Sequence, residues 1–110
     1  MKISEVSEKY NLPTATLRYY EKIGLLENIE KKNGIRNYQD KDLETIHFII
    51  CMKKSGFKLE DIITFIKEKP NKRLEMLLKQ KEELLKEIKE KEDTLDFLNY
   101  KIDIYSNKNK

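Results

Sequence analysis

The stretch Asn71–Lys110 constrains the fold most, because it contains no glycine or proline and repeats apolar residues every seven positions. With Leu74 placed at position a, apolar residues fill every a and d position except those of Lys81 and Lys91. One helix of this length would leave its apolar seam in water, so we expect a coiled-coil partner and a frayed polar end over SNKNK. The candidate dimerisation residues on the seam are Leu77, Leu84, Ile88, Leu95, Leu98 and Ile102.

The remaining residues have room for one small domain. Charged residues make up 39% and apolar residues 38% of the 110-residue chain, and the formal net charge is only +3. An excess this small indicates a polyanionic partner only if it gathers on one face of the molecule. Composition alone therefore does not predict nucleic-acid binding.

Chemistry-bearing residues are scarce. The single cysteine, Cys51, excludes an intramolecular disulfide and a multi-cysteine metal site, and its apolar neighbours predict a buried thiol. His47, the single histidine, lies four positions before Cys51 on the same predicted helix, and no aspartate or serine is clearly posed between them. We expect no enzyme activity, no cofactor and no metal. With no apolar run long enough for a membrane span and no signal-peptide core, a cytoplasmic location is expected.

Two short helices are predicted at the amino-terminal end. Ser4 is a suitable N-cap for a helix to about Tyr10, and Asn11 suits a left-handed turn. A second helix is expected to begin after Thr14 as its cap and to end at Gly24. Two short helices joined by a tight turn are the helix-turn-helix pattern.

The second helix carries a cation and two adjacent phenols. Its spacing places Leu17 and Tyr20 on an inward side and Arg18 and Tyr19 on the opposite side. An arginine can bind a guanine edge or a phosphate, and tyrosine hydroxyls can bind phosphate oxygens. From spacing alone a second interpretation stays open, in which both tyrosines are core or rim aromatics and the arginine only pairs with a nearby glutamate. The candidate contacts are Thr14, Thr16, Arg18, Tyr19 and Tyr20.

A β-hairpin is predicted next, because Asn33-Gly34 is a strong two-residue turn signal between polar arms. Lys31, Lys32 and Arg36 would line such a wing with positive charge and contact phosphates. A third helix is expected from Asp40 as N-cap to about Ser55, with Lys53 near its end as a further contact. A fourth is expected over Leu59–Glu68, with Leu59, Ile62, Ile63 and Ile66 facing inward.

Three blocks of this chain together resemble the MerR family of bacterial transcription regulators. They are TLRYYEKIGLL (Thr16–Leu26), NGIRNY (Asn33–Tyr38) and GFKLEDI (Gly56–Ile62), in the family's order and spacing. The resemblance implies a mainly α fold, in which a winged helix-turn-helix DNA-binding domain at residues 1–69 precedes a long dimerisation helix at residues 70–110. That helix would form an antiparallel coiled coil.

Family members typically bind pseudo-palindromic promoter DNA as homodimers, and many bend and untwist it so that RNA polymerase can engage the promoter. The resemblance makes Arg18, Tyr19 and Tyr20 DNA contacts and Arg36 the wing arginine. It implies double-stranded promoter DNA and a second copy of the chain as partners, with RNA polymerase at the promoter and no membrane.

The chain departs from the family pattern at several positions. Ile35 replaces a common aromatic and Asn37 a basic residue, which weakens the expected phosphate contacts of the wing although Asn37 remains a candidate contact. Lys58 replaces a small polar cap. Ile50 and Cys51 replace more polar residues, and we hypothesise that they receive the partner's coiled-coil helix.

No ligand-binding part follows the long helix, so the sequence is either a small member without a ligand pocket or part of a longer protein. Two other functions stay open: a coiled-coil interaction module whose helix-turn-helix docks a protein, and an excisionase-like architectural DNA-binding protein. The target sequence, the signal and the direction of regulation do not follow from the sequence.

Overall fold

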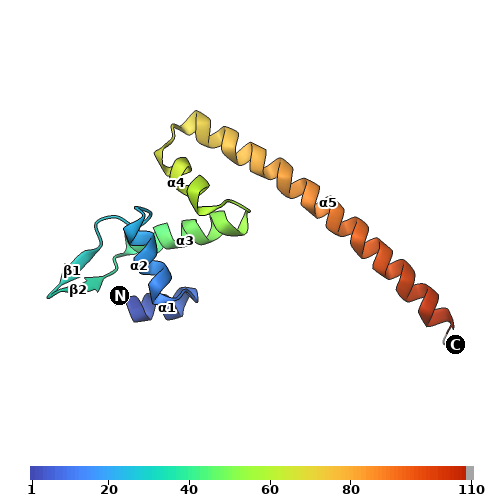
Figure 1. Cartoon of the computed structure of the whole chain (residues 1–110), viewed down its shortest axis with the longest axis horizontal. Coiled ribbons are helices and arrows are strands. Elements are labelled where there is room, and N and C mark those ends of the chain that lie inside the picture. Colours follow the sequence, from blue (N-terminus) through green and yellow to red (C-terminus); the bar gives the residue numbers. More distant parts are fainter. Residues whose placement is uncertain (109–110) are drawn as a thin grey trace. The chain divides into compact units, whose positions relative to one another are not determined.

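The computed structural model describes residues 1–108 and comprises two compact units, Met1–Lys67 and Glu68–Lys110 (Figure 1). It is mainly helical with one two-stranded sheet, as expected for a winged helix-turn-helix followed by a long helix. A domain boundary after residue 69 stays a prediction. The elements in chain order are α1 (Ile3–Tyr10), α2 (Thr14–Lys22), β1 (Glu30–Lys32), β2 (Ile35–Asn37), α3 (Asp40–Lys54), α4 (Leu59–Lys67) and α5 (Pro70–Lys108).

Helix α1 begins at Ile3, whereas a cap at Ser4 would have placed its first helical residue at Glu5. Lys2 is the N-cap, and its backbone amide donates a hydrogen bond of 2.9 Å to the side chain of Glu5. The expectation that Ser4 caps this helix was wrong, because a glutamate at the third helical position satisfies the amide ahead of the helix. The left-handed turn at Asn11 is confirmed by its φ of 54°.

Helix α2 begins at Thr14, with Pro13 as the N-cap in an extended conformation. The Pro13 carbonyl accepts hydrogen bonds from the amides of Thr16 and Leu17, at 3.0 and 3.3 Å. The expectation that Thr14 caps the helix was therefore wrong by one residue, since the proline already supplies the non-helical residue. Gly24 ends the helix as expected, with φ of 88°.

Strands β1 and β2 form the predicted hairpin. They pair antiparallel, with Lys31 opposite Arg36 and Lys32 opposite Ile35. Asn33 and Gly34 both have positive φ, 51° and 77°, which is the conformation of a type I′ turn. Just after β2, the Tyr38 amide donates to the Met1 carbonyl over 2.8 Å, which joins the base of the wing to the start of the chain.

Helix α3 is capped by Gln39 and Asp42, so the expectation that Asp40 is the cap was wrong. The Gln39 amide donates to Asp42 Oδ2 over 2.8 Å. Asp42 is 4% exposed, the one buried charged side chain among the described residues. This carboxylate satisfies an amide that would otherwise lack a partner at the helix start.

The core of the first unit lies between α1, α2, α3 and α4. Phe65 of α4 is buried there, and its ring lies 5.8 Å from that of Phe48 and 6.4 Å from that of Phe57. Ile66, predicted to face inward, is 38% exposed, because the buried face of α4 includes Phe65 in its place. The most deeply buried side chains are Val6, Leu17, Tyr20, Leu26, Ile46, Ile49 and Ile62.

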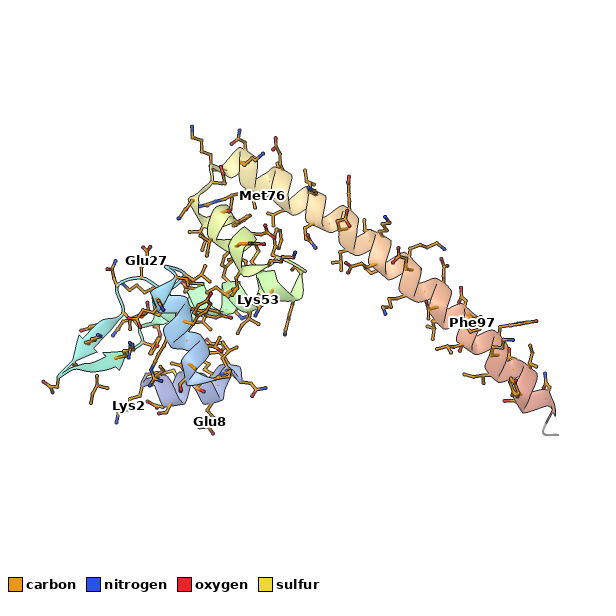
Figure 2. All side chains as sticks on the ribbon, in the orientation of Figure 1. Lys2, Glu8, Glu27, Lys53, Met76 and Phe97 are labelled. Atoms are coloured by element: carbon orange, nitrogen blue, oxygen red, sulfur yellow. The ribbon has the colours of Figure 1, made fainter. Side chains whose placement is uncertain are left out.

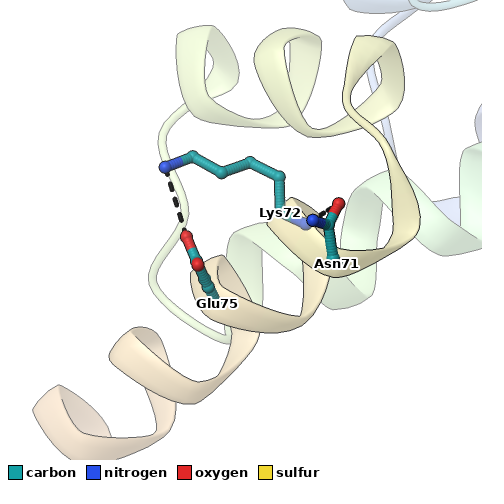
Figure 3. Close-up of polar contacts among 3 residues, drawn as sticks. All are labelled: Asn71, Lys72 and Glu75. Carbon is teal, nitrogen blue, oxygen red and sulfur yellow. Dashed lines mark hydrogen bonds and ion pairs between the residues drawn. The ribbon is translucent and has the colours of Figure 1, made fainter.

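Helix α5 spans 39 residues, about 58 Å of helix. Pro70 occupies its first helical position, where a missing N–H costs nothing. In the first turn the Lys72 amide donates to Asn71 Oδ1 over 2.9 Å, and Lys72 Nζ lies 3.3 Å from Glu75 Oε2 (Figure 3). Both Lys72 and Glu75 side chains are largely exposed, so this pair adds little stability.

The carboxyl-terminal end differs from the expected frayed tail. The helix continues through Ser106 and Asn107 to Lys108, while Asn109 and Lys110 of that tail lie outside the described residues. No helix within residues 1–108 is both long and apolar enough to cross a membrane.

Candidate nucleic-acid interface

The outward face of α2 presents the predicted cation and one phenol to solvent. Arg18 is exposed and Tyr19 is 50% exposed, while Thr14 and Thr16 in the first turn are half-buried. A half-exposed tyrosine next to an exposed arginine offers a hydroxyl and a guanidinium to the same ligand. The structure therefore places four of the five predicted α2 contacts where a ligand can reach them.

Tyr20 is the exception. Only 1% of its surface is exposed, and it packs in the core with Leu17 and Leu25. A side chain buried this deeply has no surface left for a nucleic acid, so the prediction that Tyr20 contacts DNA was wrong. Tyr20 is therefore a core aromatic, whereas Tyr19 is not part of the core.

The wing is tied to α2 by an ion pair. Arg36 Nε donates to Glu21 Oε2 over 2.7 Å, with 30% of the arginine and 24% of the glutamate side chain exposed. Because residues directly opposite in an antiparallel pair share a face, Lys31 lies on the same face of the hairpin as Arg36.

Lys32 lies on the other face of the hairpin. Successive residues of a strand point to opposite sides, so Lys32 shares its face with Ile35 rather than with Lys31. All three predicted cations are on the wing, but they are divided between its two faces. Asn37 is half-buried at the base of the wing, and its Oδ1 accepts a hydrogen bond of 3.2 Å from Met1 N. This amide is engaged within the protein.

Tyr38, which directly follows β2, is the buried tyrosine of the wing. It is 2% exposed, and its hydroxyl is the one buried side-chain oxygen or nitrogen within residues 1–108 without a hydrogen-bond partner. Burial raises the pKa of the Tyr38 hydroxyl above its ordinary value, and the Glu21 carboxylate adds to this increase. The Arg36 and Arg18 guanidinium groups oppose it. Charged side chains of both α2 and the wing therefore influence the pKa of one buried tyrosine. The sequence had not identified Tyr38 as part of this region.

Two predicted residues of α3 are on the surface of the first unit. Lys53, labelled in Figure 2, is exposed in the last turn, where a cation is favourable at a helix carboxyl end. Ile50, the proposed receiver of a partner helix, is half-buried. Each remains available for the role that the sequence suggested.

Cys51 is exposed, so the prediction of a buried thiol was wrong. The buried stripe of α3 runs through Ile46, Ile49 and Met52, and Cys51 falls on another side of the helix. Its Sγ lies 3.5 Å from Nε2 of His47, one turn earlier. No group of three or more histidine, cysteine, aspartate or glutamate side chains in the described part of the chain could hold a metal ion.

The predicted seam of α5 is in water along its length. The exposed fractions of the candidate dimerisation residues on it run from 38% for Leu84 to 59% for Ile102, and Tyr105, a further d residue, is 62% exposed. The exposed fractions of Leu77, Ile88, Leu95 and Leu98 lie between those of Leu84 and Ile102. Phe97 and Tyr100 are also exposed, at 57% and 62%, although they lie outside the a and d positions, and Lys101 Nζ lies within 6 Å of both ring centroids. Sequence reasoning missed these two aromatics because it followed only the heptad seam.

Comparison with known proteins places this arrangement in context. Residues 1–69 match the family described as MerR HTH family regulatory protein. The transcriptional regulator AdhR of Bacillus subtilis is 41% identical over 66 residues, which cover 59% of this chain and 47% of AdhR. The chain thus spans about half the length of that relative. A second regulator of Bacillus subtilis, the uncharacterized YyaN, is 34% identical over 94% of this chain and 88% of its own length.

Solved structures of MerR family regulators are also similar to this chain. A putative MerR family transcriptional regulator from Listeria monocytogenes superposes with a TM-score of 0.79 at 35% identity, covering 96% of this chain and 86% of that chain. HiNmlR, described as a MerR family regulator lacking the sensor domain and bound to promoter DNA, gives 0.80 at 32% identity, with the same two coverages.

Proposed function

The chain belongs to the MerR family of helix-turn-helix transcription regulators, and on this premise we propose that it binds pseudo-palindromic promoter DNA as a homodimer. We further propose that it regulates transcription by bending and untwisting that DNA. Residues 1–69 would bind DNA and residues 70–110 would dimerise.

The observation that carries the proposal is the surface of α2. A short helix with an exposed arginine and an exposed tyrosine lies directly after a left-handed turn and is tied to a basic hairpin. A recognition helix needs such an outward face to reach base edges in the major groove, and a wing supplies backbone contacts that fix its register. The similar HiNmlR is described as bound to promoter DNA, which supports the same role here.

The residue roles follow from side-chain chemistry. Arg18 would read a guanine or hold a phosphate, with Tyr19 beside it, and Thr14 and Thr16 would contact the backbone at the start of the helix. Phosphates flanking the groove would be bound by the remaining cations, which are Lys31, Lys32, Arg36 and Lys53.

Dimerisation is proposed from the α5 seam. Leucine and isoleucine side chains that are 38–59% exposed over a helix of about 58 Å form an apolar stripe that a monomer would leave in water. A second copy of the same helix, packed antiparallel, covers the stripe and separates two DNA-binding units by a fixed distance. Specificity would then include the spacing between half-sites and the ease with which the intervening DNA bends.

The protein-docking alternative gains support if the wing cations face away from the recognition helix. Arg36 instead contacts Glu21 on α2, and Lys31 shares its face. This observation favours the DNA-binding proposal.

The test is selection of bound duplexes from a random pool, followed by sequencing. We expect an inverted repeat with one fixed half-site spacing, bound with strong salt dependence. Permuting the position of the selected site along a DNA fragment should change its gel mobility if the protein bends it. Failure to enrich any sequence, or enrichment of single half-sites without fixed spacing, would contradict the proposed dimeric reader.

A further inference from the structure

We propose that Glu21 is a positioning residue, which holds the Arg36 guanidinium so that the wing and the recognition helix meet DNA as one unit. The inference rests on the proposed DNA binding and assigns a role to a carboxylate that would itself repel phosphate. An acidic side chain on the recognition helix is unfavourable for DNA binding unless it does something else there.

The ion pair joins two elements that are separated along the chain. Glu21 belongs to the last turn of α2 and Arg36 is the central residue of β2, 15 positions later. At 2.7 Å the Nε–Oε2 contact is a short charge-assisted hydrogen bond. Both side chains are about three-quarters covered, so water screens this pair less than it screens an exposed ion pair.

The pairing uses only one edge of the guanidinium. Arginine carries five N–H donors, and the contact with Glu21 engages Nε alone. No described residue accepts a hydrogen bond from the two terminal nitrogens of Arg36, so these remain available for a phosphate. The guanidinium group is planar and rigid. A carboxylate bound to Nε therefore restricts its orientation and the direction in which the two terminal nitrogens point.

Tyr38 anchors the end of the wing strand that carries Arg36. It follows the wing strand, is 2% exposed, and its backbone amide is held by the Met1 carbonyl at 2.8 Å. Its hydroxyl lies within the influence of Glu21, Arg36 and Arg18. Because Arg18 and Glu21 belong to the same helix, holding Arg36 against Glu21 also holds it in a defined position relative to Arg18.

Two opposite effects make the role measurable. Replacing Glu21 by glutamine removes a negative charge, which should leave binding to random DNA unchanged or tighten it. It also weakens the hold on the Arg36 side chain, because a neutral amide oxygen is a poorer acceptor for Nε than a carboxylate. Binding to the selected site should then weaken, since more of the guanidinium's ordering must occur on binding. A carboxylate that merely repels DNA would improve both kinds of binding together.

The experiment measures dissociation constants of the full chain for the selected site and for random DNA at one salt concentration. In Glu21→Gln we expect the ratio of specific to non-specific affinity to fall roughly fivefold, the scale of the difference between a charge-assisted and a neutral hydrogen bond. Glu27→Gln removes the same charge just beyond α2, where no arginine within residues 1–108 forms an ion pair with it, and should keep the ratio of the unchanged protein. In the Arg36→Ala background, Glu21→Gln should have no further effect on this ratio.

A measurement without DNA checks the contact itself. The Arg36 Nε–H proton should exchange slowly with water in the unchanged protein and at least severalfold faster in Glu21→Gln, while thermal unfolding stays nearly the same. The positioning role is wrong if the affinity ratio is unaffected, or if Glu21→Gln lowers it equally with Arg36 replaced by alanine. Absence of any sequence-selective binding by the unchanged protein overturns the proposed function, and this role with it.

Discussion

The backbone amide of Leu25 donates a hydrogen bond of 2.9 Å to the carbonyl oxygen of Tyr20 and closes the end of α2. Together with the bond from the Gly24 amide to the Glu21 carbonyl, 3.3 Å long, this forms a Schellman motif. It directs Leu25 into the core, where 4% of its surface is exposed, and so anchors the proposed recognition helix at its carboxyl end.

Gly24→Ala should lower the free energy of unfolding by about 1 kcal/mol, because an L-residue at a φ of 88° is strained. Crowding is not the cause, since the atom nearest to an added Cβ, Glu27 Oε1, would be 3.9 Å away. Urea unfolding followed by circular dichroism measures the change. Gly24→Asn is the matched control and should cost less, because asparagine tolerates positive φ. Equal losses in both variants would contradict backbone strain as the cause.

Tyr38→Phe should leave stability at pH 7 unchanged or slightly higher, because it removes a buried hydroxyl without a partner. The stability difference between the variant and the unchanged protein should increase at alkaline pH. Burial raises the folded-state pKa of Tyr38 above the unfolded value of 10.0, so its contribution is fully present below pH 10 and is lost as pH rises through the folded pKa. The variant should therefore unfold at higher pH than the unchanged protein.

The measurement for Tyr38 is ellipticity as a function of pH between about 9 and 12, alongside tyrosine absorbance. Tyr19→Phe removes a hydroxyl from a half-exposed ring and serves as the control, with no expected shift of the alkaline midpoint. A midpoint for Tyr38→Phe at or below that of the unchanged protein would show that the buried hydroxyl does not oppose ionisation.

Arg18→Ala should weaken binding to the selected site by about 1–3 kcal/mol if the guanidinium reads a base. In that case the preference at one position of each half-site should also relax. Competition of the variant against all single-base changes of the site measures both effects. A loss that is the same for every sequence would identify Arg18 as a phosphate contact.

Lys31→Ala should lower the salt dependence of binding by about one counterion, because this lysine shares the face of the wing on which Arg36 contacts α2. Lys32→Ala removes the same charge from the opposite face and should change the slope less. Slopes of the dissociation constant against salt concentration for the two variants make a matched comparison. A larger change for Lys32 would show that the wing meets DNA through its other face.

Ile88→Glu should convert the proposed dimer into monomers, because it places a charge in the middle of the α5 seam. Sedimentation velocity over a range of concentrations measures the change. Lys86→Glu alters charge at a position outside the seam and should leave the dimer intact.

Ile50→Glu tests the separate idea that α3 receives the partner's helix, since this side chain is half-buried in the first unit. We expect weaker association than in the unchanged protein. An unaltered dimer would remove α3 from the proposed interface while leaving the α5 seam in place.

The residue type alone predicted the backbone conformation at positions where a single residue must adopt a positive φ. Asn11, Gly24 and the Asn33-Gly34 turn all have the positive φ that their residue types predicted, because few other residues adopt that conformation cheaply. Helix starts were less predictable. Ser4, Thr14 and Asp40 were each expected to cap a helix, yet each helix begins at or before that residue, since Glu5, Pro13 and Asp42 satisfy or replace the cap.

The sequence by itself determined the succession of elements, the turn types, the apolar seam and, through three motifs, the family. These features depend on neighbouring residues or on regular spacing, which a linear chain displays directly. Helical spacing already placed Tyr20 inward and Tyr19 outward, but only the tertiary structure decided that Tyr20 is buried too deeply to contact a ligand, that Cys51 is on the surface, and that Arg36 reaches Glu21. Each of these depends on which side of an element another segment covers, and that is fixed by packing between residues distant along the chain.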